Sequence, residues 1–248
     1  ALEAVSVQNG LSSAHLTFID EACAAECEAR GWLIRHGVQY HWANRGYRDF
    51  DDFLAALSSG RRKTIRRERR EAQAAAEIVC LTGVDLSEEH WDAFFRFYMD
   101  TGSRKWGRPY LTRAFFSLLG EAMADQVLLV MARRDGRWIA GALNLIGGDC
   151  LYGRNWGCVE DVPFLHFELC YYQAIAWAID HGLPRVEAGA QGQHKIARGY
   201  LPKPVYSAHY IADPALRAPV ERFLEQERAG VEREMEWLEE EYSPFRHA

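Results

Sequence analysis

The spacing of hydrophobic and polar positions changes several times along the chain, and each change predicts a new element. Loosely alternating apolar positions predict strands over residues 13–19 and 32–42. Residues 20–30 between them favour a helix, with Asp20 as its N-cap and Gly31 after its end. Three elements cannot bury both faces of a sheet, so this strand–helix–strand unit should belong to something larger.

Helical spacing dominates the next part of the chain. A long helix is predicted over residues 50–76, and a short strand follows at residues 77–81. Ser87 and Thr112 are expected to cap two further helices. In the first of these, large aromatic residues recur at helical spacing and are predicted core residues: Trp91, Phe94, Phe95 and Tyr98.

A period of two then predicts an antiparallel meander of three strands. The strands are expected at residues 127–132, 138–146 and 151–156, with Gly-rich turns between them. The rest of the pattern predicts, in order, a long helix over residues 163–182, strands at 185–188 and 205–211, and an acidic amphipathic helix at 214–241. The fold class is therefore α/β, with a sheet flanked by helices.

Composition narrows the picture further. Of the 248 residues, 48% are hydrophobic, which is enough for a sizeable core and argues against disorder. The sequence has no apolar run of the roughly 18 to 20 residues that a membrane span needs, and no secretory signal. Six cysteines without C-x-x-C pairs or zinc-ligand spacing favour a reducing cytoplasm and no metal site. Cys23 and Cys27 are expected to be small helix residues rather than metal ligands.

Charge is distributed unevenly. The net charge of -6 argues against general nucleic-acid binding, yet residues 61–70, RRKTIRRERR, carry seven basic side chains and one acid. We expect Arg66, Arg67 and Arg70 to contact phosphates, with a solvated helix face as the alternative. The acidic helix near the end should pack on the body of the protein or on a second copy of the chain.

The stretch EAGAQGQHKIARGYLPKPVY, residues 187–206, is rich in candidate chemistry. It places Gln191, His194, Lys195 and Arg198 directly after a buried strand, among glycines that let backbone approach a ligand closely. We expect these side chains to bind a phosphate or carboxylate, with His194 able to shuttle a proton. A solvated basic turn is the alternative.

Several segments together carry a family resemblance. KTIRRERREA, YLTRAFFSLL, YGRNWG, HFELCYYQAIAWAIDHGL and EAGAQGQHKIARGYLPKPVYSAHYI resemble the FemAB-like predicted N-acyltransferases. That family belongs to the GNAT superfamily and is related to the Fem peptidoglycan aminoacyltransferases. The resemblance implies a complete GNAT-like domain at residues 50–212, the last elements of a first GNAT-like domain at 1–49, and an acidic C-terminal helix at 213–248.

The resemblance also implies a site. In a GNAT fold, donor and acceptor meet where two central strands splay, beside Arg154 and Asn155 on one strand and Glu187 and Gln191 on the other. The expected catalytic residues are Glu168, His166, Glu187 and His194. The expected substrate-binding residues are Arg154, Asn155, Gln191, Lys195, Arg198, Trp106 and Tyr110. Structural roles remain the alternative: Glu168 offsets a helix dipole, His166 packs, and Glu187 pairs with an arginine.

The implied activity is transfer of an acyl or aminoacyl group to a primary amine of a small molecule or peptide, by direct attack. Acyl-CoA or acyl carrier protein is the expected donor, with no tightly bound cofactor. One departure from ordinary GNAT proteins matters: residues 153–169, GRNWGCVEDVPFLHFEL, lack the Gly-rich pyrophosphate loop. Two alternatives therefore stand. One is a tRNA-dependent aminoacyltransferase acting on a cell-wall precursor, which is less favoured, and the other is a non-catalytic binding module.

Overall fold

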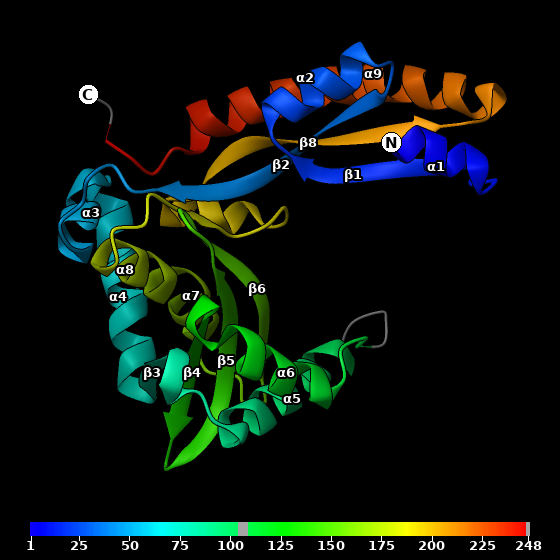
Figure 1. Ribbon diagram of the computed structural model, residues 1–248. Coiled ribbons are helices and arrows are strands. Elements are labelled where there is room, and N and C mark those ends of the chain that lie inside the picture. The colour runs from blue at the N-terminus through cyan, green and yellow to red at the C-terminus, as the bar shows by residue number, and fades with distance from the viewer. Residues whose placement is uncertain (104–108, 247–248) are drawn as a thin grey trace. The chain divides into compact units, whose positions relative to one another are not determined.

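The computed structural model describes residues 1–103 and 109–246 and divides into two compact units (Figure 1). Unit 1 contains residues 1–40 and 201–243, and unit 2 contains residues 41–200 with the final residues of the chain. The predicted division into two copies of one domain, at residues 49 and 212, stays a prediction.

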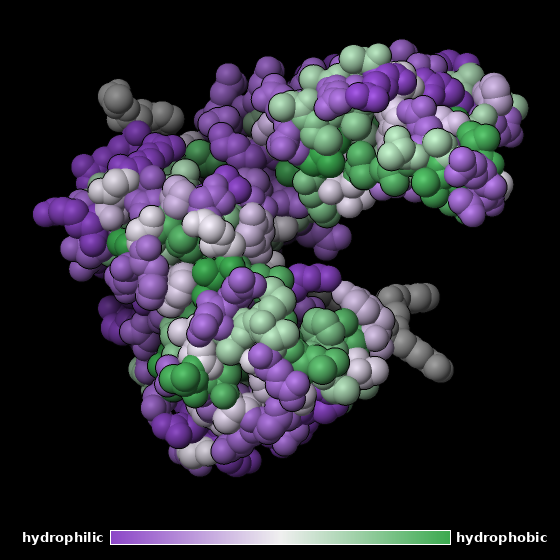
Figure 2. Space-filling model, in the orientation of Figure 1, coloured by the Kyte–Doolittle hydropathy of each residue, from purple (hydrophilic) through white to green (hydrophobic). Residues whose placement is uncertain are grey.

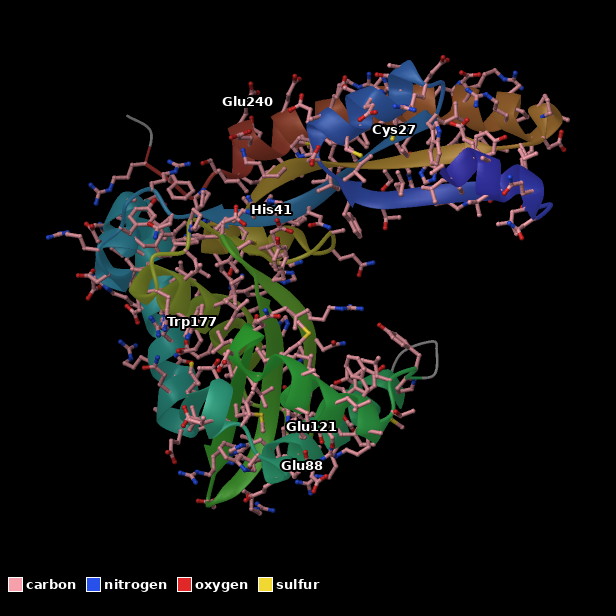
Figure 3. All side chains as sticks on the ribbon, in the orientation of Figure 1. Cys27, His41, Glu88, Glu121, Trp177 and Glu240 are labelled. Carbon is pink, nitrogen blue, oxygen red and sulfur yellow. The ribbon has the colours of Figure 1, made fainter. Side chains whose placement is uncertain are left out.

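Unit 1 is a three-stranded sheet with helices on both faces. Its strands stand in the order β1 (Ser13–Ile19), β8 (Leu201–Ile211) and β2 (Leu33–Ala43). Helix α2 (Glu21–Ala29) packs Ala24 and Cys27 on one face, and α9 (Pro214–Tyr242) packs Leu224 on the other. Cys27 is labelled on α2 in Figure 3. The two faces separate because successive strand residues point in opposite directions. Asp20 caps α2 as predicted, accepting the backbone N–H of Cys23.

The sequence pattern did not predict α1 (Leu2–Gln8), which is too short to show a clear helical period. Helix α9 forms over nearly the predicted residues and leaves several large apolar side chains exposed, among them Leu216, Phe223 and Trp237. Its predicted contact with a second copy of the chain stays a prediction.

Unit 2 is built on the predicted meander. Strands β4 (Val127–Arg134), β5 (Arg137–Ile146) and β6 (Cys150–Cys158) pair antiparallel, and β3 (Glu77–Leu81) adds to the outer edge of β4. On the other side, β7 (Arg185–Glu187) pairs parallel to β6 and antiparallel to the last residues of β2. Mixed pairing of this kind is the α/β arrangement predicted from the order of elements.

Helices cover both faces of the meander, so β4 is buried along most of its length. On one face, α5 (Glu88–Ser103) and α6 (Arg113–Met123) bury aromatic residues, including Trp91 and Phe94 as predicted. The approach of α5 to β6 is close, because a Cβ at Gly157 would lie 2.3 Å from the Phe97 carbonyl oxygen. The outer face of α6 leaves apolar residues exposed, with Leu118 at 61% (Figure 2).

The second face is covered by α4 (Ser59–Ala75), α7 (Leu165–Phe167), the π-helical turn η3 (Glu168–Tyr172) and α8 (Gln173–Asp180). Short 3-10 turns complete the unit: η1 (Gly83–Asp85), η2 (Ala124–Gln126) and η4 (Gln193–Arg198). One prediction needs correction here. The helix expected over residues 163–182 contains a π-helical turn at Glu168–Tyr172.

The single helix predicted over residues 50–76 is wrong. It is two helices, α3 (Phe50–Ala56) and α4, separated by an extended Leu57. Leu57 forms a β-bridge with Phe245, and the Ser58 N–H donates to the Pro244 carbonyl oxygen at 2.9 Å. Backbone pairing with a distant segment therefore replaces the helical hydrogen bonds at this point.

Among the described residues, no helix combines the length and the apolar character that crossing a membrane requires. No disulfide joins any of the six cysteines, all of which lie in the described ranges, and the cytoplasmic location predicted from them stays a prediction. Over residues 1–103 and 109–246, no cluster of three or more His, Cys, Asp or Glu side chains is arranged to hold a metal ion.

Candidate functional site

A cleft of about 730 Å³ opens in unit 2 where two parallel strands part. β7 pairs with β6 over three residues, and the last pair is Glu187 opposite Tyr152. Beyond this pair β7 ends, while β6 continues. The space left beside β6 is lined by the rest of that strand, by α5, by the turn around η3 and by the loop after β7. A ligand placed here lies at the carboxyl ends of the strands, where α/β sheets commonly bind substrates.

β6 contributes two of the predicted substrate-binding residues. Its pairing with β5 shifts between Leu143 and Asn144, so Arg154 is the extra residue of a β-bulge, a feature common beside active sites. The Arg154 guanidinium donates a 2.8 Å hydrogen bond to the Tyr110 hydroxyl. Asn155 lies in the cleft wall with its side-chain oxygen buried and, among the described residues, without a hydrogen-bond partner.

Helix α7 and the π-helical turn that follows it place three more side chains at the cleft: His166 from α7, and Cys170 and Tyr171 from the turn. Single π turns often occur at functional sites, because the added residue redirects the side chains around it. The His166 ring packs against Trp156 and Tyr171, with centroids 5.1 Å and 5.4 Å away. Tyr171 shares a 3.0 Å hydrogen bond between its hydroxyl and His194 Nε2.

The loop after β7 turns sharply and returns as η4. Gly192 has φ 103°, and a Cβ there would lie 2.4 Å from the His194 ring, so the turn requires glycine. The turn brings Lys195 into the cleft lining with only 5% of its surface exposed. Its Nζ donates to the carbonyl oxygens of Ala188 and Gly189, and burial lowers the pKa of the ammonium. Burial, followed by the charges of Arg198 and Lys195, lowers the pKa of His194.

Two buried carboxylates fasten α4 to the turns that line the cleft. Glu68 accepts two 2.9 Å hydrogen bonds from Arg198 Nη2 and another from the Tyr172 hydroxyl. Arg198 Nη1 also donates to the His194 carbonyl oxygen at 2.8 Å, so this ion pair fixes the position of His194.

The second carboxylate, Glu168, is fully buried. It accepts hydrogen bonds from Arg69 at 3.2 Å, Gln73 at 2.8 Å and Gln173 at 2.7 Å. These donors satisfy the charge of a carboxylate that would be costly to bury alone. They also hold the π-helical turn against α4.

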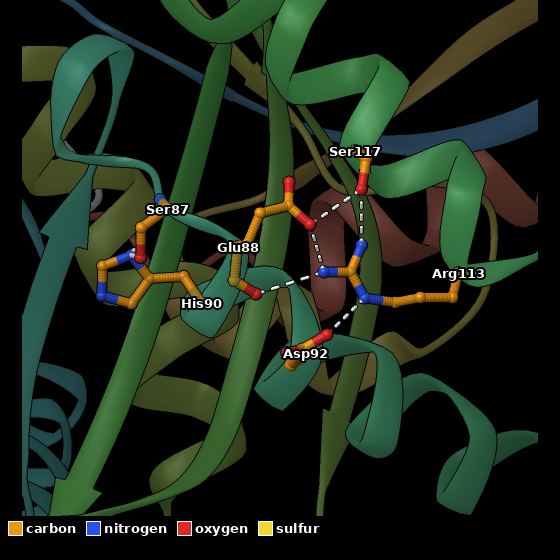
Figure 4. A network of polar contacts seen from close by, with 6 residues as sticks. All are labelled: Ser87, Glu88, His90, Asp92, Arg113 and Ser117. Carbon is orange, nitrogen blue, oxygen red and sulfur yellow. Dashed lines mark hydrogen bonds and ion pairs between the residues drawn. The ribbon is translucent and has the colours of Figure 1, made fainter.

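A third polar network fixes the α5–α6 side of the cleft. The Tyr98 hydroxyl accepts the backbone N–H groups of Tyr110 and Leu111 at 3.1 Å and 3.2 Å. Arg113, at the start of α6, donates to Glu88 and Asp92 of α5 and to Ser117 of its own helix (Figure 4). Tyr110, Leu111 and the start of α6 are thereby tied to α5.

A second hollow, of about 430 Å³, lies along α4 and is lined by basic side chains. We call it the basic groove; its residues are Ser59, Arg62, Lys63, Thr64, Arg66, Arg67 and Arg70. Arg66 is paired with Asp51 at 2.9 Å and Arg67 with Glu71 at 3.8 Å. Within residues 1–103 and 109–246, Arg62, Lys63 and Arg70 have no ion-pair partner. The groove thus retains positive charge that no ion pair within the described residues neutralises.

The structure gathers six of the predicted residues in the cleft lining: Tyr110, Arg154, Asn155, His166, Gln191 and Lys195. Glu168 and Arg198 lie behind it in their buried ion pairs, and His194 reaches it through Tyr171. Glu187 instead pairs with Arg185 at 3.3 Å, and Trp106 lies outside the described residues.

Tyr171 and Cys170 were missed by the sequence reasoning. Their position depends on a π-helical turn, for which the hydrophobic period gives no signal. The only sequence signal for these two residues is the run HFELCYY, residues 166–172, which places several polar and aromatic side chains together.

Comparison with known proteins identifies the family of the chain and its fold. The FemAB-like family model, described as peptidoglycan biosynthesis/recognition, matches residues 1–247. Among solved structures, the C-terminal domain of a putative lysylphosphatidylglycerol synthetase from Agrobacterium fabrum matches with TM-score 0.65 and 10% identity, covering 89% of this chain and 74% of that one. No curated protein sequence matches the chain.

Two further structures share the fold. L-PGS from Bacillus licheniformis matches with TM-score 0.60 and 12% identity, over 90% of this chain and 76% of that one. FemX matches with TM-score 0.61 and 12% identity, over 89% of this chain and 77% of that one. The chain therefore belongs to the FemAB-like family, has a GNAT-like fold and is a transferase of the acyltransferase class.

Proposed function

We propose that the protein transfers an acyl or aminoacyl group from an activated carrier to a primary amine by direct attack within the cleft. The observation that carries the proposal is the pairing, in one cleft, of the Lys195 ammonium with the Tyr171–His194 hydrogen bond. Acyl transfer to an amine needs a proton acceptor and a positive group for the developing oxyanion. The cleft holds a candidate for each.

Proton removal is assigned to His194 acting through Tyr171. The lowered pKa of His194 keeps its ring neutral near pH 7, so its Nε2 can accept a proton from the Tyr171 hydroxyl. As the amine attacks, it passes its proton to the Tyr171 oxygen while the hydroxyl proton moves to His194. Burial raises the pKa of Tyr171, so a free tyrosinate is unfavourable and the two transfers should be concerted.

Oxyanion stabilisation is assigned to Lys195. Two backbone carbonyls hold its ammonium at the cleft wall, and a preorganised charge needs no reorganisation when the tetrahedral intermediate forms. The intermediate then collapses by breaking the bond to the carrier, which leaves with its electron pair. Cys170 is an unsuitable nucleophile because burial raises the pKa of its thiol, and this favours direct attack over an acyl-enzyme.

The acceptor amine is positioned by β6. The buried Asn155 oxygen can accept an N–H of the incoming amine, and a matching amine would remove the cost of leaving that oxygen unpaired. The family description suggests that this amine belongs to a peptidoglycan precursor or a related peptide.

For the donor, acyl-CoA and acyl carrier protein come first. Both carry phosphate that the basic groove could bind. Ordinary pyrophosphate binding at the helix after β6 is disfavoured, because residues 153–169 lack the Gly-rich loop and contain the acidic Glu160, which pairs with Arg134 and Arg137. An aminoacyl-tRNA donor is the second candidate, favoured by the basic groove and by the similarity to FemX.

The test is a transfer assay on the full chain with acyl-CoA, acyl carrier protein and aminoacyl-tRNA donors, each against a panel of amines. Product is detected by mass, and RNase treatment identifies tRNA-dependent transfer. The Tyr171→Phe variant should lose most of the kcat for the active donor and retain donor binding. Absence of transfer from every donor, with folded protein, would contradict the proposal and favour a binding module.

A further inference from the structure

A histidine pair lies in unit 1, which contributes no residue to the lining of the cleft or of the basic groove. On the antiparallel strands β1 and β8, His15 stands directly opposite His209. Their Nδ1 atoms are 2.8 Å apart, and the other nitrogen of His15, Nε2, lies 2.9 Å from the Ser13 hydroxyl. The two rings meet edge to face with centroids 5.0 Å apart. Two imidazole nitrogens therefore converge on one point beside the sheet.

That convergence has the dimensions of a metal chelate. Two imidazole nitrogens bound to one tetrahedral zinc ion at about 2.0–2.1 Å lie about 3.3 Å apart. The observed separation of 2.8 Å needs to widen only slightly for an ion to replace the shared proton. The Ser13 hydroxyl orients the His15 ring from its other nitrogen, as groups behind a metal ligand commonly do.

The charges around the pair permit a cation. Burial lowers the pKa of His209, with smaller contributions from His15 and Arg35, so the ring is available as a neutral ligand. The positive charge of Arg35 on β2 is offset by Glu227 of α9, which accepts hydrogen bonds from it at 2.8 Å and 2.6 Å. His15 is exposed, which leaves solvent able to fill the remaining coordination positions.

We propose that His15 and His209 form a two-histidine site for a divalent transition metal ion of the Zn²⁺ or Ni²⁺ type. Imidazole ligands suit these ions. The bound ion would link edge strand β1 to β8 and stabilise unit 1, because the two ligands are adjacent only in the folded sheet. The site is independent of acyl transfer.

The experiment titrates the full chain with Zn²⁺ alone at pH 7.5, by calorimetry and by thermal unfolding. Loss of an outer-sphere partner alone typically weakens metal binding 10–100-fold, so His15→Asn or His209→Asn should weaken this site by at least about tenfold. Both variants should also abolish the increase in Tm that Zn²⁺ gives the native chain. His36→Asn is the matched control on β2 and should bind like the native chain.

A measurement on the native chain tests the site even if the variants do not fold. Histidine side-chain ¹H–¹⁵N spectra should show Zn²⁺ shifting the resonances of His15 and His209 before those of the other histidines. Unchanged resonances for this pair, or native affinity in both variants, would overturn the proposal and assign any bound zinc to cysteines or other histidines.

Discussion

The cleft and the basic groove are both hollows of unit 2, yet they differ in how their polar groups are held. In the cleft, Lys195 and Tyr171 are buried and fixed by named hydrogen bonds, and burial shifts the pKa of each. In the groove, Arg62, Lys63 and Arg70 are arranged along one side of α4 with no ion-pair partner in the described chain. Preorganised groups can stabilise the charge that develops in a transition state, whereas solvated charges mainly attract an oppositely charged ligand to the surface.

The single helix α4 separates these two environments. Its inward face carries Glu68 and Arg69, which anchor η4 and η3, while its outward face forms the basic groove. The same helix therefore holds the turns that line the cleft and presents the charge that, under our proposal, attracts a phosphorylated carrier. Changes in the cleft should alter kcat, and changes in the groove should alter KM.

The largest expected effect follows from replacing Lys195 with methionine. The substitution keeps the volume of the side chain and removes its charge, so kcat should fall about 100-fold or more through loss of oxyanion stabilisation. Steady-state kinetics with the active donor provides the measurement. Lys203→Met, at an exposed position of β8, is the matched control and should keep native kcat. A rise in KM with kcat unchanged would mean that Lys195 only binds substrate.

The pH profile tests the cleft without a drastic substitution. As pH rises through the lowered pKa of His194, the ring becomes neutral and kcat/KM should rise, by about tenfold per pH unit along the limb. As pH rises further through the lowered pKa of Lys195, the ammonium is lost and the rate should fall.

The plot of kcat/KM against pH should therefore be bell-shaped. The midpoint of its acid limb should lie below about pH 6.5 and that of its basic limb below about pH 10.5, the ordinary pKa values of histidine and lysine. Lys195→Met should remove the basic limb and His194→Gln the acid one. A limb that survives its own substitution would assign that ionisation to another group.

The same contrast explains what the sequence could predict. Local spacing identified the meander, the glycine-bounded loop and Lys195, because strand period and turn chemistry are properties of neighbouring residues. The partners of Glu168 and Arg198 could not be predicted, since Arg69 and Glu68 lie 99 and 130 residues earlier in the chain. Only the packing of α4 brings these charges together.

The helix boundaries predicted for residues 50–76 were wrong for a related reason. The pattern of residues 50–76 is helical throughout, but Leu57 and Ser58 pair with Phe245 and Pro244 near the end of the chain. Tertiary hydrogen bonding overrode local propensity at that point. The π-helical turn is held by the contacts of Glu168 with α4, which are likewise invisible to a local pattern.

A smaller effect is expected in the basic groove. Changing Arg62 and Lys63 together to glutamine should raise the donor KM about 5- to 10-fold at low salt and leave kcat unchanged, because exposed charges act by screened attraction. The increase should shrink when KM is measured at high salt. The matched control changes two exposed arginines of α9, Arg222 and Arg233, to glutamine. If kcat falls instead, the groove takes part in positioning and the contrast with the cleft is lost.

The smallest effect should come from Tyr110→Phe, at the rim of the cleft. The change removes one 2.8 Å hydrogen bond from the Arg154 guanidinium, and a net loss of about 1 kcal/mol corresponds to roughly a fivefold effect. Because Tyr110 is 70% exposed, water replaces much of the lost bond, and we expect only a two- to threefold rise in acceptor KM. Unchanged kinetics would show that solvent substitutes fully for the hydroxyl. A large fall in kcat would instead place Tyr110 among the preorganised groups and extend the chemical part of the cleft out to its rim.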